Sequence, residues 1–377
     1  MKLYRSLKRQ TTWPRLVQYF ESVAVMEMVP NRADTSIQAG VDTGKGLFAI
    51  RPTLFVVVVL SIVFVTSTYK FWSHSILSCN PTGYDSDHYL GYCQAEGYGD
   101  YEHGAFWFNL EPPAQDQARK ANVLFVGDSR LQFGFSTKAT SDWFVSASSS
   151  YYLMGFVAWE NYLFAGELIR KLSPQAKVYI INLDTFFERS ESQPAKIVLH
   201  DESARDRHEA KRRWQVLHQS ICKTFSIICG HNYDFFRSRL TGAYTARGLD
   251  RLKYKPALAS YDQAIDQTVV KDYTETGRGF LPQLPVRPEC IIFTIVPTVG
   301  THVRTANDIA VNLGINFVAP ELDGLETFDG SHLALPSAER WSKAFLAAAG
   351  PQILRCVEDQ PMPSASTSPV RTITGFR

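Results

Sequence analysis

Short apolar runs alternate with amphipathic stretches between residues 119 and 356. The runs are rich in β-branched and aromatic residues, which indicates buried strands; they are ANVLFVG, VSASSSYYLMG, AKVYIINLD, CIIFTIVP and GINFVAP. Helices are expected at three places: from about Arg130, in WENYLFAGELIRKL before Pro174, and in SAERWSKAFLAAAG from Ser337 to Gly350. This alternation predicts an α/β domain with a central parallel sheet covered by helices on both faces.

The most hydrophobic segment lies outside this pattern. PTLFVVVVLSIVFVTSTY, between Arg51 and Lys70, carries no charge over roughly eighteen residues, near the lower length for a membrane-spanning helix. A buried strand seldom runs so long without a turn, and a cleaved signal peptide does not start some fifty residues into a chain. We therefore expect a transmembrane signal anchor over residues 52–72.

The flanks of this segment predict its orientation. Residues 1–51 carry eight Lys and Arg against four Asp and Glu, which favours a cytoplasmic tail on that side. All six cysteines follow the segment, as expected for an oxidising compartment. The sequence thus predicts a single-pass protein of the inner, cytoplasmic membrane with a periplasmic or other extracytoplasmic domain.

Cysteine spacing leaves the pairing open. Cys79 with Cys93 and Cys222 with Cys229 are the local candidates among fifteen connectivities. Cys222 and Cys229 cannot pair across two unbroken helical turns, where about 10 Å would separate them, and buried free thiols are the alternative. The cysteines and the nine histidines show no zinc-ribbon, HxxxH or HExxH spacing, so we expect no metal and no other cofactor.

Three further segments flank or interrupt the α/β pattern. Residues 73–118 contain turn-like clusters (NPTGYDSD, EGYGDYEHG) and predict an irregular lead-in, and the Pro/Ser/Thr-rich residues 357–377 predict a disordered tail. Residues 186–285 predict a mostly helical, charged insertion with one apolar stripe, made of Trp214, Leu217, Ile221 and Phe225. This insertion is either a solvated helical face packed on the sheet domain or a cationic cover that meets a phospholipid head group or an acidic polysaccharide.

The net charge of +2 gives no reason to expect nucleic acid as a partner.

One serine, Ser129, lies at the carboxyl end of a predicted strand, where the active sites of α/β proteins usually lie. In NVLFVGDSRLQFG, Ser129 follows a strand directly and would open the next helix, whose N-terminus favours a developing oxyanion. A serine nucleophile needs a base oriented by a third group. FDGSHLALP supplies Asp329 and His332, three residues apart in a loop before the final helix. The GxSxG elbow is absent, since Leu131 occupies its last position, which argues against an α/β-hydrolase.

The early GDS and the late DxxH resemble the SGNH/GDSL hydrolase superfamily. VLFVGDSRLQFGFST is similar to the first block of bacterial SGNH-like proteins tied to cell-surface polysaccharide O-acetylation, including the periplasmic alginate acetylation proteins. The resemblance spans about residues 119–350, with firm matches only at its two ends. It implies a flavodoxin-like three-layer sandwich in which Ser129 is the nucleophile and Asp329 and His332 form the dyad.

The resemblance also implies an oxyanion hole. Its donors would be the backbone N–H groups of Ser129 and Gly155, the latter in YYLMGF, although Gly155 also fits a simple turn glycine. The family often carries Gly-x-Asn-Asp in a third block, and the chain departs from it with IINLDTFF. Asn182 is the nearest amide there and Asp184 the nearest carboxylate. Asn182 is either the third donor or a strand-end residue that satisfies backbone groups.

Taken together, the resemblance and the expected topology imply a membrane-anchored, exported O-acetyltransferase or acetylesterase that acts on a cell-envelope or exopolysaccharide glycan. Its partners would be an acylated glycan or a carbohydrate acceptor, with a membrane acyltransferase as the donor. The alternative is a catalytically weak or inactive SGNH-like domain that binds glycan or scaffolds an envelope polysaccharide assembly. The missing third block and the charged insertion favour that alternative.

Overall fold

The computed structural model of the chain describes residues 52–95, 97–230, 232–251 and 255–359. The expected cytoplasmic tail, and all but the first residues of the expected C-terminal tail, lie outside these ranges. The chain divides into two compact units, residues 1–60 and residues 61–377. The sheets, the disulfides and the candidate site all belong to the second unit.

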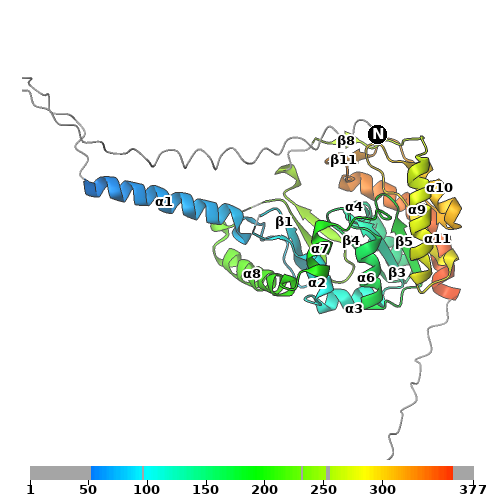
Figure 1. Ribbon diagram of the computed structural model, residues 1–377, viewed down its shortest axis with the longest axis horizontal. Helices are drawn as coiled ribbons and strands as arrows, with labels where there is room; N and C mark the ends of the chain where they lie inside the picture. The colour runs from blue at the N-terminus through cyan, green and yellow to red at the C-terminus, as the bar shows by residue number, and fades with distance from the viewer. Residues whose placement is uncertain (1–51, 96, 231, 252–254, 360–377) are drawn as a thin grey trace, which may run out of the picture. The chain divides into compact units, whose positions relative to one another are not determined.

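A five-stranded parallel sheet forms the centre of this unit (Figure 1). Its order is β10-β9-β5-β3-β4, which is the flavodoxin-like arrangement 2-1-3-4-5 read from the other edge. The strands are β3 (Val123–Asp128), β4 (Tyr151–Phe156), β5 (Val178–Asn182), β9 (Ile291–Thr294) and β10 (Asn316–Phe317). β5, β9 and β10 lie within the predicted apolar runs, and β3 and β4 each run one residue past theirs. The predicted α/β class with a central parallel sheet is confirmed.

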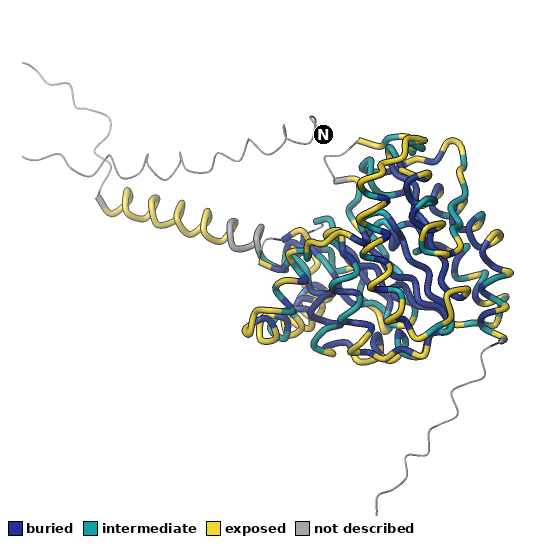
Figure 2. The backbone as a smooth tube through the Cα atoms, turned by 45° about the vertical axis from the view of Figure 1, so that its right-hand side comes forward, coloured by how far each residue is buried: buried dark blue, intermediate teal, exposed yellow. Residues whose placement is uncertain are grey.

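Alternate side chains of the central strands enter two separate cores, and β3, β4, β5 and β9 are buried throughout, whereas the edge strand β10 is not (Figure 2). Val123 and Phe125 pack with one helical layer, while Leu124 and Val126 pack with the other. The first layer consists of α4 (Ser129–Phe135), α5 (Lys138–Ser146) and α11 (Leu335–Asp359). The second contains α3 (Pro112–Lys120), α6 (Tyr162–Leu172), α9 (Gln267–Phe280) and α10 (Val303–Leu313). Helices therefore cover both faces of the sheet.

The final helix is longer than expected. It does not end at Gly350 but continues through Pro351 to Asp359. A side chain at position 350 would come within 2.9 Å of the Trp143 ring, so packing rather than a helix cap explains this glycine. The extension is held by the buried side chain of Ile353 and by the disulfide of Cys356.

Residues 73–118 are not an irregular lead-in, so that prediction is wrong. They contain η1 (Ile76–Ser78), β1 (His88–Cys93), β2 (Gly99–Asp100), α2 (Glu102–Trp107) and most of α3. β1 pairs antiparallel with β6 (Asp234–Ser238), which lies in the insertion, and a second sheet of order β2-β1-β6-β7 results. β1 could not be recognised from its own residues, because its partner lies roughly 150 residues further along the chain.

The insertion is only partly helical. It contains α7 (Gln193–His200), α8 (Ala204–Thr224), η2 (Ser226–Ile228), α9 and η4 (Leu281–Gln283). It also contains strands that the sequence did not predict: β6, β7 (Tyr244–Arg247) and β8 (Ala257–Leu258), the last paired with β11 (Glu326–Thr327). Two further short 3-10 helices are η3 (Leu249–Arg251) and η5 (Pro288–Cys290).

The second sheet closes the edge of the first at β4. The backbone N–H of Leu153 donates to the Thr241 carbonyl at 2.8 Å, and Arg237 of β6 donates to the carbonyls of Leu153 and Gly155 at 2.5 and 3.0 Å. Arg237 is fully buried and pairs with Glu102 of α2 at 2.9 Å. An open strand edge is a template for unwanted pairing, and here side chains and a loop occupy it.

The predicted anchor segment is helical, as α1 (Pro52–His74). Its large apolar side chains from Leu54 to Val65 are exposed. In the part of the chain that the structure describes, however, no helix is long and apolar enough to cross a membrane. The helix is thus present, but the transmembrane span predicted over 52–72 is not confirmed.

All six cysteines are paired, so free thiols are ruled out in this structure. The disulfides are Cys79–Cys93, Cys222–Cys229 and Cys290–Cys356. α8 ends at Thr224, and the chain then turns through η2, which brings the Cα atoms of Cys222 and Cys229 to 5.8 Å. The expected obstacle to this pair, an unbroken helix, is therefore absent.

Candidate active site

The GDS sequence has a local physical explanation. A side chain at Gly127 would come within 3.1 Å of the Asn182 Cβ, so β3 and β5 approach closely only with glycine there. Asp128 is the N-cap of α4, and its Oδ1 accepts from the backbone N–H of Arg130 and, at 3.5 Å, of Leu131. Ser129 is therefore the first residue of α4, at the carboxyl end of β3, where the strand order reverses.

The DGSH sequence forms a tight turn before α11. Asp329 Oδ1 accepts from the backbone N–H of Ser331 at 2.9 Å and of His332 at 2.8 Å. Gly330 has a φ of +85°, in the left-handed region that favours glycine. Thr327 is buried, and its hydroxyl oxygen accepts from the Gly330 N–H at 3.0 Å while its hydroxyl donates to the Ala257 carbonyl at 2.8 Å. The turn is thus tied to β8, outside the main sheet.

The two loops meet. Ser129 Oγ lies 2.8 Å from His332 Nε2, and His332 Nδ1 lies 2.7 Å from Asp329 Oδ2. Because a carboxylate only accepts, the bonding assigns the ring proton to Nδ1 and leaves Nε2 to accept from the Ser129 hydroxyl. The structure therefore brings together the three residues that the sequence analysis singled out, 203 positions apart at their widest.

Asp329 is held ionised by its surroundings. Burial opposes its charged form, but the hydrogen bond and charge of His332, with the two backbone N–H bonds of the turn, keep the pKa of Asp329 below its ordinary value. A carboxylate beside Nδ1 stabilises the imidazolium that forms when Nε2 takes up a proton.

Aromatic rings fix the plane of the His332 imidazole, and the sequence analysis did not identify them. Phe328 stacks on the imidazole at 5.5 Å between ring centroids, and Phe133 of α4 meets it edge-on at 4.9 Å. Phe133 in turn contacts Phe235 of β6 at 5.2 Å and Tyr244 of β7 at 6.0 Å. The second sheet thus supports the orientation of the proposed base through Phe133.

Arg130 links three parts of the site and was also missed. Its Nε donates to the Ser331 hydroxyl at 2.9 Å, and its guanidinium forms an ion pair with Asp184, just beyond β5. The residue after the serine therefore holds the histidine loop to the end of the neighbouring strand. The IINLDTFF sequence gave Asp184 as the nearest carboxylate, but no pattern in it indicated Arg130 as its partner.

The two backbone N–H groups expected in the oxyanion hole are those of Ser129 and Gly155, and they lie in different surroundings. The Asp128 cap uses the N–H groups of Arg130 and Leu131 and leaves that of Ser129 outside the cap. Gly155 lies inside β4 rather than in a turn, and a side chain there would come 2.5 Å from the Asp128 carbonyl oxygen. This close approach alone requires glycine, so the role of its N–H stays a prediction.

Asn182 is committed elsewhere. Its Nδ2 donates to Asp128 Oδ1 at 3.3 Å, and its Oδ1 accepts from the Val296 backbone N–H at 3.0 Å. The side chain is buried and connects β3 to the chain beyond β9. These bonds fit the strand-end role, and the oxyanion role that the family resemblance implied stays a prediction that would depend on the second Nδ2 hydrogen.

A strained loop follows β4 on the Ser129 side of the sheet. Asp128 and Phe156 are register partners at the ends of β3 and β4, so this loop starts beside the serine. Ala158 and Trp159 have φ values of +66° and +54°, a region that costs non-glycine residues on the order of 1–3 kcal/mol each. The Trp159 side chain is 65% exposed. The loop thus presents an indole ring to solvent three residues beyond Phe156, the register partner of Asp128.

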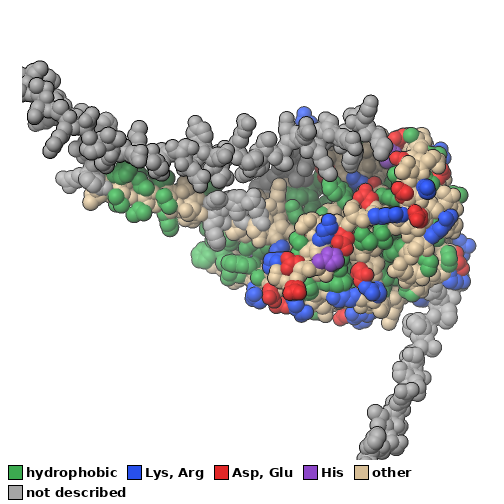
Figure 3. All heavy atoms as spheres, in the orientation of Figure 1, with side chains coloured by type: hydrophobic (Ala, Val, Ile, Leu, Met, Phe, Trp, Pro, Cys, Tyr) green, Lys and Arg blue, Asp and Glu red, His purple; other side chains and the backbone are tan. Residues whose placement is uncertain are grey.

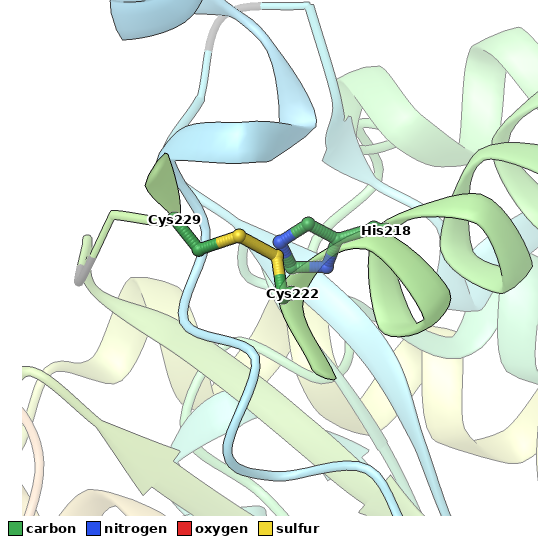
Figure 4. A group of neighbouring side chains, drawn as sticks. All are labelled: His218, Cys222 and Cys229. Atoms are coloured by element: carbon green, nitrogen blue, oxygen red, sulfur yellow. A yellow bond between two sulfur atoms is a disulfide. The ribbon is translucent and has the colours of Figure 1, made fainter. Parts of the chain in front are cut away.

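Among the residues that the structure describes, two groups place potential metal ligands close together. In the first, Cys222 and Cys229 form a disulfide beside the His218 ring, which leaves the imidazole as the one ordinary ligand (Figure 4). In the second, His103 is bonded through both ring nitrogens, to Asp100 and Glu160 at 2.8 Å each, and Glu102 is paired with Arg237. Burial lowers the pKa of His103, but these two carboxylates together raise it to about 10, which fits an ion-pair network better than a metal site.

Comparisons of the chain with protein-family models, with curated proteins and with solved structures found no match. The likeness to the SGNH superfamily therefore stays a prediction from the sequence. The Ser129 site itself is the basis on which a function is proposed.

Proposed function

We propose that the chain is a serine acyl-transfer enzyme of the SGNH type, an O-acetyltransferase or acetylesterase acting on a cell-envelope or exopolysaccharide glycan. The contact of Ser129 Oγ with His332 Nε2, backed by Asp329, is the observation that carries this proposal. A nucleophile, a base and an orienting carboxylate in one hydrogen-bonded row are the minimum that covalent acyl transfer requires.

The first half-reaction forms an acyl-enzyme. Ser129 Oγ attacks the ester carbonyl carbon while its proton passes to His332 Nε2, and the carbonyl oxygen becomes an oxyanion. The tetrahedral intermediate collapses when the C–O bond to the alcohol breaks and His332 Nε2 protonates the leaving oxygen. Asp329 stabilises the imidazolium between these two steps and is not itself protonated.

The second half-reaction differs only in its nucleophile. A sugar hydroxyl, in transfer, or water, in hydrolysis, gives its proton to His332 Nε2 and attacks the acyl carbon. The proton then returns to Ser129 Oγ as the ester bond to the enzyme breaks. The Ser129 N–H is the first oxyanion donor in this scheme and the Gly155 N–H the second.

The exposed Trp159 ring supports a carbohydrate substrate. An indole stacks well on the apolar face of a sugar ring, because it offers a large flat surface at little conformational cost. It stands on the loop that starts beside Ser129, and the backbone strain of that loop fixes where the ring is presented. A sugar seated there would have its hydroxyls near the acyl carbon.

The location follows from sequence features. The charge asymmetry around residues 52–72 and the six cysteines favour an exported domain held at the inner membrane. A membrane acyltransferase would then deliver the acyl donor close to the bilayer.

A non-catalytic glycan-binding or scaffolding domain is the second candidate. The commitment of Asn182 to structural bonds favours it, since loss of one oxyanion donor costs roughly 10²–10³ in rate.

Labelling with a fluorophosphonate, followed by intact mass, separates the two candidates. We expect one adduct at Ser129 in the wild-type chain and none in Ser129→Ala. Acetyl release and acetyl transfer measured side by side should both fall on the order of 10⁴-fold or more in Ser129→Ala. The exposed Ser146→Ala, on α5, is the matched control and should behave as wild type. An inert Ser129, or an alanine variant with wild-type rates, would leave only the binding function.

A further inference from the structure

α8 lies with its apolar stripe outward. The stripe residues Trp214, Leu217 and Phe225 are 48%, 45% and 60% exposed, and Val216 is 67% exposed. The buried positions of the helix are instead mostly polar: Ala204, His208, Gln215, His218 and Cys222. A surface helix of a soluble domain normally buries its apolar side, so this face lacks the partner that its composition requires.

Specific bonds fix this orientation. Gln215 Nε2 donates to the Leu90 carbonyl at 2.8 Å, and Gln215 Oε1 accepts from the Leu90 N–H at 3.3 Å. His218 Nδ1 lies 3.2 Å from the Tyr84 hydroxyl. Rotating the helix to bury its stripe would break the bonds of Gln215 to Leu90 and the contact of His218 with Tyr84.

A disulfide-closed loop extends the same apolar surface. The sequence CKTFSIIC, residues 222–229, is closed by the Cys222–Cys229 bond, with both cysteines buried. At its tip Ile227 is 93% exposed, and Phe225 and Ile228 are also exposed. Figure 3 shows hydrophobic side chains gathered at this end of α8. We name the surface of Trp214, Val216, Leu217, Phe225 and Ile227 the α8 apolar surface.

This surface adjoins the place where the chain leaves α1. Gly230 N–H donates to the Leu77 carbonyl at 2.6 Å, and Asn232 N–H donates to the Ser78 carbonyl at 3.0 Å. A side chain at position 230 would come 2.5 Å from the Ser78 carbonyl oxygen, so the contact is close. η1, which contains both carbonyls, follows α1 directly, and the part of α1 in the same unit exposes Ile62, Val63, Phe64 and Val65.

Basic residues border the surface. α8 carries six Lys and Arg against two Asp and Glu, and Arg212, Arg213 and Lys223 are exposed next to the apolar side chains. Aromatic and aliphatic side chains beside Lys and Arg are the composition of segments that lie in the interface of an anionic lipid bilayer.

We propose that the α8 apolar surface inserts into the interfacial layer of a lipid bilayer, with Phe225 and Ile227 deepest. The disulfide keeps the tip of the loop folded in the orientation that contacts lipid. The bonds to η1 hold the end of this loop against the segment that directly follows α1, so a membrane-anchored α1 would bring the tip to the bilayer. The inference is independent of the chemistry proposed for Ser129.

Photolabelling of the full chain tests this. The protein is reconstituted in vesicles of phosphatidylcholine and phosphatidylglycerol that contain a diazirine on the acyl chain, irradiated, reduced and digested with trypsin. We expect adducts on the peptides WQVLHQSICK and TFSIICGHNYDFFR, and none above background on the peptide that contains the exposed Val311. Ile227→Asp should lower the labelling of WQVLHQSICK roughly tenfold, because a carboxylate resists insertion.

Val145→Asp, at another exposed valine, is the matched control and should leave the labelling unchanged. Circular dichroism and the mass of the oxidised chain verify that Ile227→Asp folds with its disulfides. Labelling of 214–237 no stronger than that of the Val311 peptide, or unchanged labelling in Ile227→Asp, overturns the proposal. So does a dimer in lipid-free solution that Ile227→Asp dissociates, since a second copy of the chain would then be the occupant.

Discussion

At the scale of single residues, the site depends on how His332 is held. Asp329 contacts Nδ1, Ser129 contacts Nε2, and the rings of Phe133 and Phe328 lie against the imidazole. These contacts come from α4 and from the turn before α11, so the site rests on packing between distant segments rather than on either motif alone.

Replacing Asp329 by Asn should leave the turn in place but remove the charge that stabilises the imidazolium. An amide also presents an N–H to Nδ1 in one of its orientations, which favours the wrong tautomer. We expect Asp329→Asn to lower kcat for acyl transfer on the order of 10³ to 10⁴-fold, as measured in an acetyl-release assay. A variant that keeps more than a tenth of the wild-type rate would show that Asp329 has no part in catalysis.

The same carboxylate should affect stability in acid. Because its pKa is lowered on folding, Asp329 contributes stability that is present above the unfolded-state pKa of about 4 and is lost as pH falls through the folded-state pKa. Denaturant titrations should show Asp329→Asn less stable than wild type at pH 7, with the gap narrowing below about pH 4. Asp272→Asn, at an exposed carboxylate on α9, should show no such convergence.

The sequence identified Ser129 from its place between a predicted strand and a helix, and Asp329 and His332 from their three-residue spacing in a loop before the final helix. The structure adds that Asp128 caps α4 and that Gly330 permits the tight turn. Arg130 and Phe133 could not be identified, since their partners, Asp184, Ser331 and the second sheet, are distant in the chain. Asn182 was ambiguous from the sequence, because an amide at the end of a strand can either donate to an oxyanion or bond to backbone groups.

At the scale of elements, the loop after β4 is where we expect substrate selection. Trp159→Ala should raise KM for an oligosaccharide substrate about tenfold, the loss of one stacked ring, and leave kcat/KM for a small aryl acetate near the wild-type value. Trp159→Phe retains a ring and should recover part of the loss, while Val145→Ala serves as an unrelated surface control. Equal losses on both substrates would place Trp159 in the structure of the site and not in sugar binding.

The elements that periodicity predicted belong to the buried central sheet and to the helices that cover it. β5 and α6 lie within the predicted segments, and β3 runs one residue past its own. β1 and β6 were missed, because HYLGYC and DFFRS read as strands only when paired with each other. α11 runs past its expected end, where the buried Ile353 and the Cys290–Cys356 disulfide hold it, and no local pattern reveals these contacts.

At the scale of the whole molecule, the Cys290–Cys356 disulfide joins the start of β9 to the last turns of α11. It closes a loop of 66 residues, whereas Cys222–Cys229 closes one of 7. From the chain entropy of the unfolded state, the pair Cys290→Ser/Cys356→Ser should lower the free energy of unfolding by about 4 kcal/mol.

The matched pair Cys222→Ser/Cys229→Ser should cost less, about 2.5 kcal/mol by the same relation. Denaturant titration of the oxidised variants measures both losses. An equal or larger loss from the short loop would show that local structure, and not loop length, sets the contribution of these bonds.

The pairing of β1 with β6 has a consequence for biogenesis. Roughly 150 residues separate the register partners His88 and Ser238, so β1 emerges from the ribosome on the order of 10 to 30 s before its partner is synthesised. If the domain is exported as proposed and export keeps pace with synthesis, the tyrosine-rich β1 waits on the far side of the membrane with only β2 beside it, and the edge that β6 later covers stays unpaired. A chaperone of that compartment could bind β1 until β6 is synthesised. Faster translation would shorten the time for which β1 needs such binding.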